Sequence, residues 1–259
     1  MTKFCRFSGA ALLAAAFWAH ASASTDDVIA MARAYLGTEA ALESVNSIHY
    51  TGTLTGEETI KDNTGKEVRR PFNGDIDIIF QKPYYQRVKL VSYKGTEITA
   101  LDDYEAWRRL EDPADSTRWS LTLLSKDQIK RLRASTWENL AFFRGIEELG
   151  GHVEDHGSAT VDGRSCEKLV FVHEPGIEFS RYFDAATGRL VLTLLESGDR
   201  IQEEGEIMVN GVRFPKILIH ITKDSTTWKE YATVLTLDKI TLNEIFPDSL
   251  FAVPMYTGQ

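Results

Sequence analysis

The stretch VDGRSCEKLVFVHEPGIEFSRYFDAATGRLVLTLL, residues 161–195, begins a series of short strand-like segments that continues to Pro254. Asp162-Gly163 and Asn210-Gly211 are residue pairs that tolerate positive φ in a two-residue hairpin turn, and residues 184–188 form a longer loop closed by glycine. The segments between the turns are rich in aromatic and branched residues: 179–183, 190–195, 207–209, 214–222 and 226–242. The C-terminal half is therefore predicted to be one antiparallel meander.

Residues 214–222 indicate how this meander is buried. Ile217, Ile219 and Ile221 alternate with the intervening side chains, so one face of the strand is wholly apolar. A sheet with such a face is stable only when that face packs against another element.

The first half of the chain also has strand signals. They fall at 48–54, 75–80, 88–90, 98–101 and 105–110, with a polar stretch at 57–70 that we expect to be an exposed hairpin tip or loop. Short strands with regularly spaced turns favour a sandwich or barrel over parallel βαβ units.

Two helical regions interrupt the strands. Residues 25–45 predict a helix capped by Thr25 and broken at Gly37-Thr38, with a second short helix at 39–43. Residues 125–149 contain two capping boxes, Ser125 with Gln128 and Ser135 with Glu138, which predict two consecutive helices or one kinked helix. The apolar stripe of this insert is expected to cover the sheet, so the predicted fold class is mainly β with helices (α+β).

The N-terminus has the pattern of a secretory signal peptide. Lys3 and Arg6 precede an apolar segment, and Ala21-Ser22-Ala23 is a typical cleavage site, so residues 1–23 are expected to be removed. Residues 24–259 then form one exported domain, and no cysteine at the cleavage site provides a lipid anchor. Removal of two basic residues changes the formal net charge from −9 to −11, which disfavours nucleic acid as a partner.

The sequence has no recognisable catalytic or metal-binding pattern. His152 and His156 share a face if they lie on a strand, but they are then about 13 Å apart and are expected to be solvated. Cys166 is expected to be a small buried hydrophobe. No nucleophile-elbow, zinc-protease or nucleotide-binding motif occurs. We therefore expect neither an enzyme nor a metal or cofactor.

Two motifs in the first half resemble a known family. Phe80-Gln-Lys-Pro83, followed by Arg87 and then by Asp103-Tyr-Glu-Ala-Trp107, is similar to the LolA/LolB-like periplasmic lipoprotein carrier superfamily. The segments 209–215 and 243–254 are similar to those of broader relatives. The resemblance implies an incomplete antiparallel β-barrel (half-barrel) closed by a helical lid, with an apolar cavity for acyl chains. It also implies that the basic residue before the proline, here Lys82 where the carriers have arginine, holds the lid shut.

The resemblance implies a periplasmic carrier or binding protein for a lipoprotein acyl chain or other lipid. The alternative is an envelope sensor or protein-interaction module with the same fold. Envelope membrane proteins are further expected partners, and the protein is expected to be a monomer. The expected cavity residues, each of which could instead belong to a filled core, are Ile76, Ile78, Phe80, Val88, Leu90, Trp107, Trp137, Leu140 and Phe143.

Overall fold

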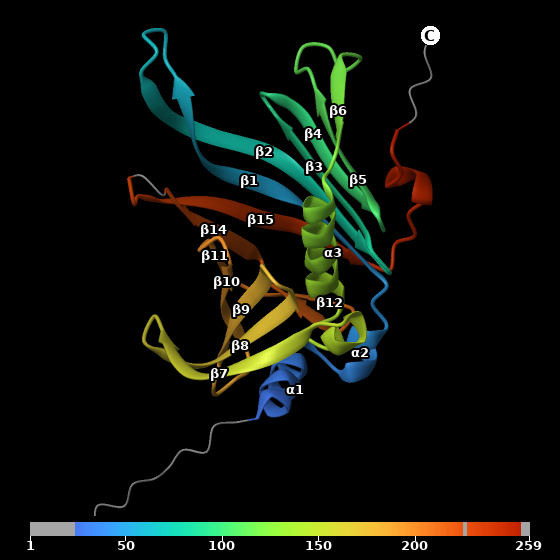
Figure 1. Ribbon diagram of the computed structural model, residues 1–259, viewed down its shortest axis with the longest axis vertical. Coiled ribbons are helices and arrows are strands. Elements are labelled where there is room, and N and C mark those ends of the chain that lie inside the picture. The colour runs from blue at the N-terminus through green and yellow to red at the C-terminus, as the bar shows by residue number, and fades with distance from the viewer. Residues whose placement is uncertain (1–23, 225–226, 255–259) are drawn as a thin grey trace, which may run out of the picture.

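One large antiparallel sheet dominates the computed structural model, which describes residues 24–224 and 227–254. Its thirteen strands follow the order β6-β5-β4-β3-β2-β1-β15-β14-β11-β10-β9-β8-β7, and β12 pairs separately with β13. The sheet is strongly bent but not closed, and helices lie against its concave side (Figure 1). The predicted class, an open half-barrel with helices, is confirmed. The predicted signal peptide lies outside the described residues.

The strands fall into two halves that follow the order of the chain. The N-terminal half consists of β1 (Ser47–Lys61), β2 (Glu67–Gln81), β3 (Tyr85–Ser92), β4 (Gly95–Asp102), β5 (Glu105–Glu111) and β6 (Trp119–Leu123). The C-terminal half consists of β7 (His152–Val161), β8 (Arg164–Glu174), β9 (Ile177–Asp184), β10 (Leu190–Leu195), β11 (Arg200–Glu204), β14 (Ile217–Lys223) and β15 (Glu230–Leu242), with the small hairpin β12 (Ile207–Val209) and β13 (Val212–Phe214).

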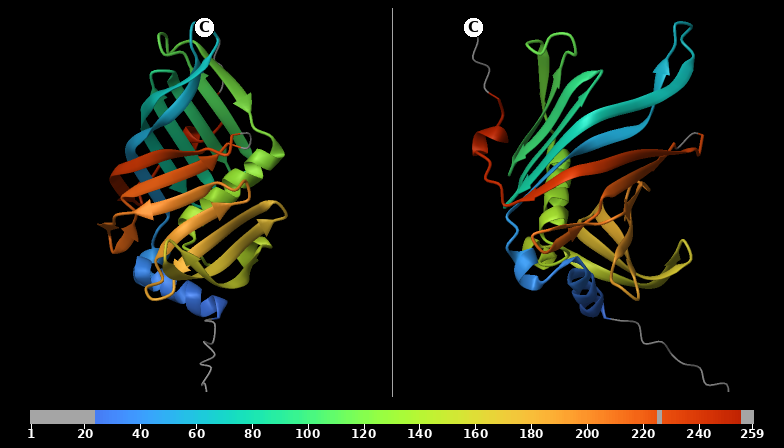
Figure 2. Two further views of the ribbon diagram at one scale, coloured as in Figure 1. Left: turned by 90° about the vertical axis from the view of Figure 1, so that its left-hand side faces the viewer. Right: turned by 180° about the vertical axis from the view of Figure 1, so that it is seen from behind.

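The pairing of β1 with β15 joins the two halves. Ile48 lies opposite Leu242 and Leu54 opposite Leu235, with an irregularity between Thr51 and Gly52. A Cβ atom at Gly52 would lie 2.1 Å from the carbonyl oxygen of Thr236, so the close approach of the two strands here requires glycine. The two halves are inclined to each other, with α3 (Lys126–Leu140) in the angle between them (Figure 2).

The predicted hairpin turns are confirmed. Asp162 and Gly163 have φ of 48° and 78°, and Asn210 and Gly211 have φ of 48° and 81°, as a two-residue hairpin turn requires. The predicted strand at 214–222 is instead divided between β13 and β14, because Pro215 has no N–H to donate to a ladder.

The first hairpin is longer than expected. Residues 57–70 do not form a loop, since the pairing of β1 with β2 continues to Lys61 and Glu67. Cross-strand ion pairs support this extension: Arg69 lies 2.8 Å from Glu57, and Arg70 lies 2.8 Å from Glu58. A polar composition indicated exposure correctly, but the opposite charges allow the exposed segments to pair as strands.

The first two helices, α1 (Thr25–Leu36) and α2 (Glu39–Glu43), lie at one end of the molecule. The N-cap of α1 is Ser24, which forms a capping box with Asp27, and not Thr25. The predicted break at Gly37 and the predicted second helix are confirmed.

One of the two predicted capping boxes begins α3. Ser125 accepts from the backbone N–H of Gln128, whose side chain bonds back to the cap. The prediction of a second box at Ser135 is wrong, because Ser135 lies inside α3 and the Glu138 carboxylate bonds His173 and Arg181 on the sheet. After α3 the chain turns through the 3₁₀-helix η1 (Ile146–Leu149); a second one, η2 (Asp248–Leu250), lies near the C-terminus.

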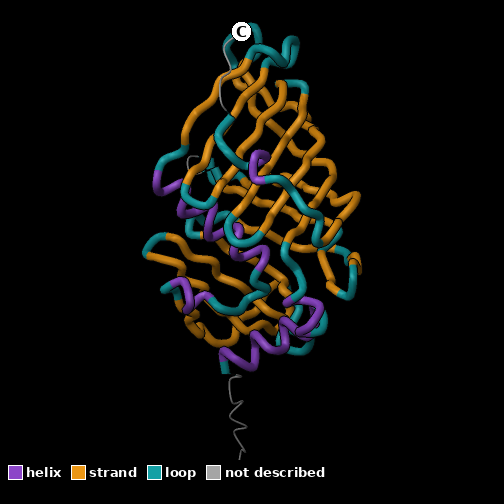
Figure 3. The backbone as a smooth tube through the Cα atoms, turned by 90° about the vertical axis from the view of Figure 1, so that its right-hand side faces the viewer, coloured by secondary structure: helices purple, strands orange, loops and turns teal. Residues whose placement is uncertain are grey.

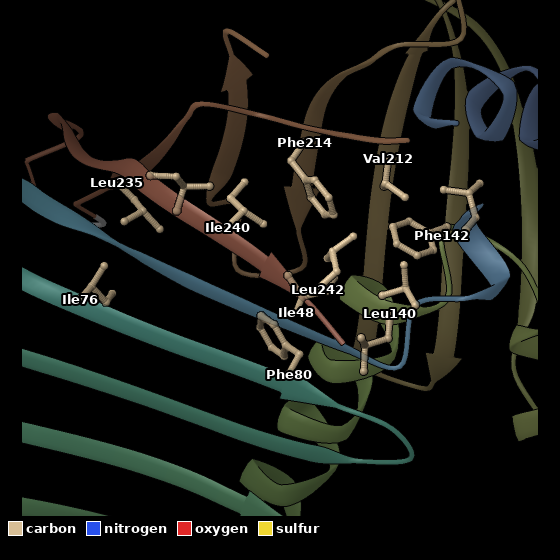
Figure 4. Close-up of a cluster of buried hydrophobic side chains, with 13 residues drawn as sticks. Ile48, Ile76, Phe80, Leu140, Phe142, Val212, Phe214, Leu235, Ile240 and Leu242 are labelled. Carbon is tan, nitrogen blue, oxygen red and sulfur yellow. The ribbon is translucent and has the colours of Figure 1, made fainter. Parts of the chain in front are cut away.

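The concave face carries two large apolar clusters, and the tube view shows α3 running obliquely across the strands, with the N-terminal helices at the lower end of the molecule (Figure 3). The first cluster joins β1, β2 and β15 to α2 and to the end of α3; its members include Ile48, Phe80, Leu140, Phe142 and Leu242 (Figure 4). The second joins α1 and α3 to β8 and β9. Within the described segments, no helix is long and apolar enough to cross a membrane.

Candidate functional site

A cavity of about 330 Å³ lies between the concave face and the helices, within the size range of about 300–1,000 Å³ that is typical of ligand pockets. Side chains from α1, α3, the segment after α3 and most strands of the sheet line it. Most of the lining is apolar; its members include Leu36, Ile78, Phe80, Phe142, Phe143, Phe179, Leu190, Phe214, Leu218 and Leu235. The cavity is therefore a candidate site for an apolar chain.

Three of the nine residues expected to line a cavity do so: Ile78, Phe80 and Phe143. The other residues predicted on β2 and β3 share the same sheet face, since Ile76 pairs with Leu90 and Ile78 with Val88. Ile76 and Leu140 are nevertheless packed in the first apolar cluster, Val88 packs against that cluster, and Leu90 is half-buried. Trp137 packs against Phe171 in the second cluster.

Trp107 lies on the other face of the sheet. Cross-strand pairs place four side chains on the cavity face of the sheet: Phe80, Gln86, Leu101 and Ala106. Trp107 follows Ala106 on the same strand, so its side chain points away from the cavity. Its indole Nε1 donates to the carbonyl oxygen of Phe251 at 2.7 Å. Trp107 thus anchors the C-terminal segment against the sheet.

The apolar stripe of β14 is also on the other face. Leu218 lies opposite Leu235, and both line the cavity, whereas Ile217, Ile219 and Ile221 alternate away from it and are half-buried. The stripe therefore lies away from the helices, because the register with β15 and not the local composition decides which side faces inward.

Lys82 is exposed in the turn between β2 and β3, and its ammonium makes no hydrogen bond or ion pair with any residue the structure describes. The contact expected of a latch is made by Arg33 of α1. Arg33 Nη1 donates to the carbonyl oxygens of Ala141 at 3.2 Å and Phe142 at 2.8 Å, just after α3 ends. Its other nitrogens bind Glu39, and only 3% of Arg33 is exposed. A planar guanidinium suits this multiple bonding better than an ammonium does.

Charged groups interrupt the apolar lining, and several of them lie near α3 and β9. Arg181 on β9 donates through Nη2 to Glu138 on α3, and Glu138 also bonds His173 at 2.7 Å. Glu203 on β11 lines the cavity nearby, and burial raises the pKa of its carboxyl to about 7 although Arg181 and Arg189 oppose this. Burial, with Glu203 close by, raises the pKa of the Tyr50 hydroxyl.

No metal centre is found in the part of the chain that is described. No group of three histidine, cysteine, aspartate or glutamate side chains there could hold an ion. His152 and His156 share a face of β7, as predicted, and both bond the exposed Glu154, at 3.1 and 2.9 Å. Cys166 is buried, as expected.

Sequence reasoning missed Arg33, Arg181 and Glu203. The signal for Arg181 was present: it alternates with Phe179 and Phe183, so the three side chains share a face of the strand. A charged residue at an inward position is rare unless it is paired. Arg33 gave no such signal, because a lone arginine on a helix is usually solvated.

Comparison with solved structures defines the class of fold. A LolA superfamily protein from Nitrosomonas europaea is 14% identical with a TM-score of 0.53, and the match covers 86% of this chain and 97% of that one. A domain assigned to outer membrane lipoprotein-sorting proteins, from Vibrio parahaemolyticus, is 9% identical with a TM-score of 0.51, covering 86% and 95%. A DUF1329 family protein from Desulfovibrio piger is 10% identical with a TM-score of 0.51, covering 88% and 96%.

These likenesses concern the fold, given the low identities. No family model matches the chain, and no curated protein does. The chain thus has a LolA-like fold, as the motifs around Lys82-Pro83 and Trp107 predicted.

Proposed function

We propose that this protein is a periplasmic carrier or binding protein for an apolar chain, either a lipoprotein acyl chain or another lipid, held without covalent chemistry in the cavity. The observation that carries the proposal is the apolar lining between the concave face and the helices, to which Ile78, Phe80 and Phe143 contribute. Each methylene group removed from water there contributes about 0.8 kcal/mol, so a chain of moderate length would be held firmly.

The helices supply a means of entry and release in this proposal. The segment after α3 closes one side of the cavity through Phe142 and Phe143, and Arg33 holds its carbonyl groups. In this proposal the breaking of those hydrogen bonds lets the segment move, which also withdraws Phe142 and Phe143 from the apolar clusters on the sheet. Lys82 lies near the same region, beside Glu43, and is proposed as a second contact in a more closed state.

A matched pair of substitutions on β14 tests the proposal. Leu218→Trp fills the cavity, whereas Ile219→Trp adds the same ring to the opposite face of the same strand. A fluorescent hydrophobic probe is expected to bind the wild type and the Ile219 variant equally, and the Leu218 variant at least several-fold more weakly. Equal binding by all three folded proteins would show that the probe does not enter the cavity.

Native mass spectrometry of protein purified from its own envelope tests the nature of the occupant. A co-purifying lipid or lipoprotein is expected. A lipid-free mass with a bound protein would instead support the alternative, an envelope sensor or protein-interaction module.

A further inference from the structure

Several polar groups of the cavity lie together on one part of the sheet. Arg181, Thr193 and Ile201 lie side by side across β9, β10 and β11. Glu203 is two residues beyond Ile201 and therefore on the same face, next to Leu218. One part of a mostly apolar cavity thus has polar and charged groups close together, which we call the polar end (Tyr50, Arg181 and Glu203).

Only some of the donors of this polar end have a partner among the described residues. Arg181 is only 7% exposed, and of its five N–H donors only those of Nη2 have a partner, Glu138, within the described chain. Its Nε is buried without a hydrogen bond, and so is the Nε of Arg213, another cavity residue. Buried unpaired donors cost free energy, so their presence beside a cavity indicates a binding partner that accepts hydrogen bonds.

The charge of the polar end also favours an anion. The Glu203 side chain makes no hydrogen bond with the residues described, and its raised pKa means that it holds a proton in a large fraction of molecules at neutral pH. With Glu203 protonated, Arg181, Arg189 and Glu138 sum to a charge of +1, which one anionic group would neutralise. A protonated Glu203 and the Tyr50 hydroxyl are moreover donors themselves.

We propose that the cavity binds a single-chain carboxylic acid of the fatty-acid type, with its carboxylate at Arg181 and Glu203 and its chain along Phe80 and Phe143. This inference rests on the proposed function and narrows it to a free acid. An acyl chain in ester or amide linkage lacks the anionic group and would leave Arg181 unpaired. An amine would place a cation beside Arg181 and Arg189.

Calorimetric titration of the delipidated protein at neutral pH with dodecanoic acid, its methyl ester and dodecylamine tests this. The acid is expected to bind at least about tenfold more tightly than the ester, because a charge-assisted hydrogen bond is worth about that much. The amine is expected to bind most weakly.

Variants of the polar end assign the preference to these residues. Arg181→Lys keeps a cation beside Glu138 but loses the guanidinium fork, so the affinity for the acid is expected to fall about tenfold while that for the ester is unchanged. If this variant does not fold, Tyr50→Phe removes one donor and retains the ring, with a several-fold loss for the acid alone. The matched control is Arg200→Gln on the opposite face of β11, where Arg200 pairs with Glu230.

The outcomes separate this inference from the proposed function. Equal affinity for acid and ester, or tightest binding of the amine, would overturn the acid-binding polar end and leave the apolar carrier in place. Failure of both acid and ester to bind would overturn the carrier itself.

Discussion

Arg33 is the residue that connects the N-terminal helix to the segment after α3. It is almost fully buried, and its guanidinium is divided between the Glu39 carboxylate and the carbonyl oxygens of Ala141 and Phe142. Both carbonyl groups follow the last turn of α3, where no later N–H of the same helix is available. The contact therefore satisfies the Phe142 carbonyl and adds a second partner to the Ala141 carbonyl, which also accepts from the backbone N–H of Arg144 at 3.3 Å.

Arg33→Gln is expected to lower the free energy of unfolding by about 2–3 kcal/mol, because charge-assisted hydrogen bonds to buried carbonyl groups are lost. It should also increase binding of a hydrophobic probe, as the segment after α3 becomes free to move. Urea denaturation and probe fluorescence measure the two effects.

Arg144→Gln is the matched control, since Arg144 also pairs with Glu39, at 2.9 Å, but is exposed and should cost under about 0.5 kcal/mol. Lys82→Ala separates the two candidate latches. A larger increase in probe binding from Lys82→Ala than from Arg33→Gln would assign the latch to Lys82.

Glu203 makes the stability of the protein depend on pH. Its pKa is about 7 in the folded protein against an ordinary 4.5, so between those pH values the folded state retains a proton that the unfolded state has lost. The free energy of unfolding should therefore fall as pH rises from 4.5 to 7. The difference between these two pKa values corresponds to a total of about 3 kcal/mol.

Glu203→Gln should remove this decline in the free energy of unfolding, as measured by urea denaturation at a series of pH values. Identical pH profiles for the two proteins would contradict a protonated Glu203.

At the scale of elements, α3 is held on the sheet by polar contacts spread along its length. Arg133 pairs with Asp103, Thr136 donates to Gln86 at 3.1 Å, and Glu138 bonds Arg181 and His173. The apolar contacts at its C-terminal end, through Trp137 and Leu140, belong to two different clusters. The helix is thus attached to the concave face by polar contacts along its length and by apolar contacts at its C-terminal end.

Ser125→Ala is expected to destabilise the protein by about 1 kcal/mol, because the first turn of α3 loses its side-chain cap. Ser135→Ala is the control: Ser135 lies within the helix and caps nothing, so alanine should be neutral or slightly stabilising. Thermal denaturation of both variants gives the comparison. A greater loss of stability in Ser135→Ala than in Ser125→Ala would mean that the contacts of Ser135 at the cavity outweigh the higher helix propensity of alanine.

At the scale of the whole molecule, the cavity exists because one sheet bends around two helices. The bend depends on the pairing of β1 with β15, which brings residues 47–61 against residues 230–242. The helices α1 and α3 then lie against part of the concave side. The cavity is therefore formed by the elements of the fold itself, and no additional inserted segment is needed to create it.

Export is an expectation from the sequence, in which the mature protein begins near Ser24. Intact-mass analysis of protein from the periplasmic fraction should give the mass of residues 24–259 without acylation. Retention of residues before Ala21, or an added acyl group, would contradict this expectation.

Local sequence determined the positions of most strands, the hairpin turns and the first turn of α3. Asp162-Gly163, Asn210-Gly211 and Ser125 with Gln128 act through φ values and hydrogen bonds that a few neighbouring residues decide. The period of two also placed Ile76, Ile78 and Phe80 on one face. Motif order identified the class of fold.

Only the tertiary structure decided which of these side chains face empty space. Ile78 lines the cavity while Ile76 is packed, and Trp107 and the stripe at 217–221 lie on the opposite face. Arg33 bonds carbonyl groups that lie more than a hundred residues further along the chain. The environment of Glu203 is likewise made by residues of other strands and loops. The physical reason is that alternation along a strand is local, whereas the register, the bend of the sheet and the unfilled volume depend on how distant segments meet.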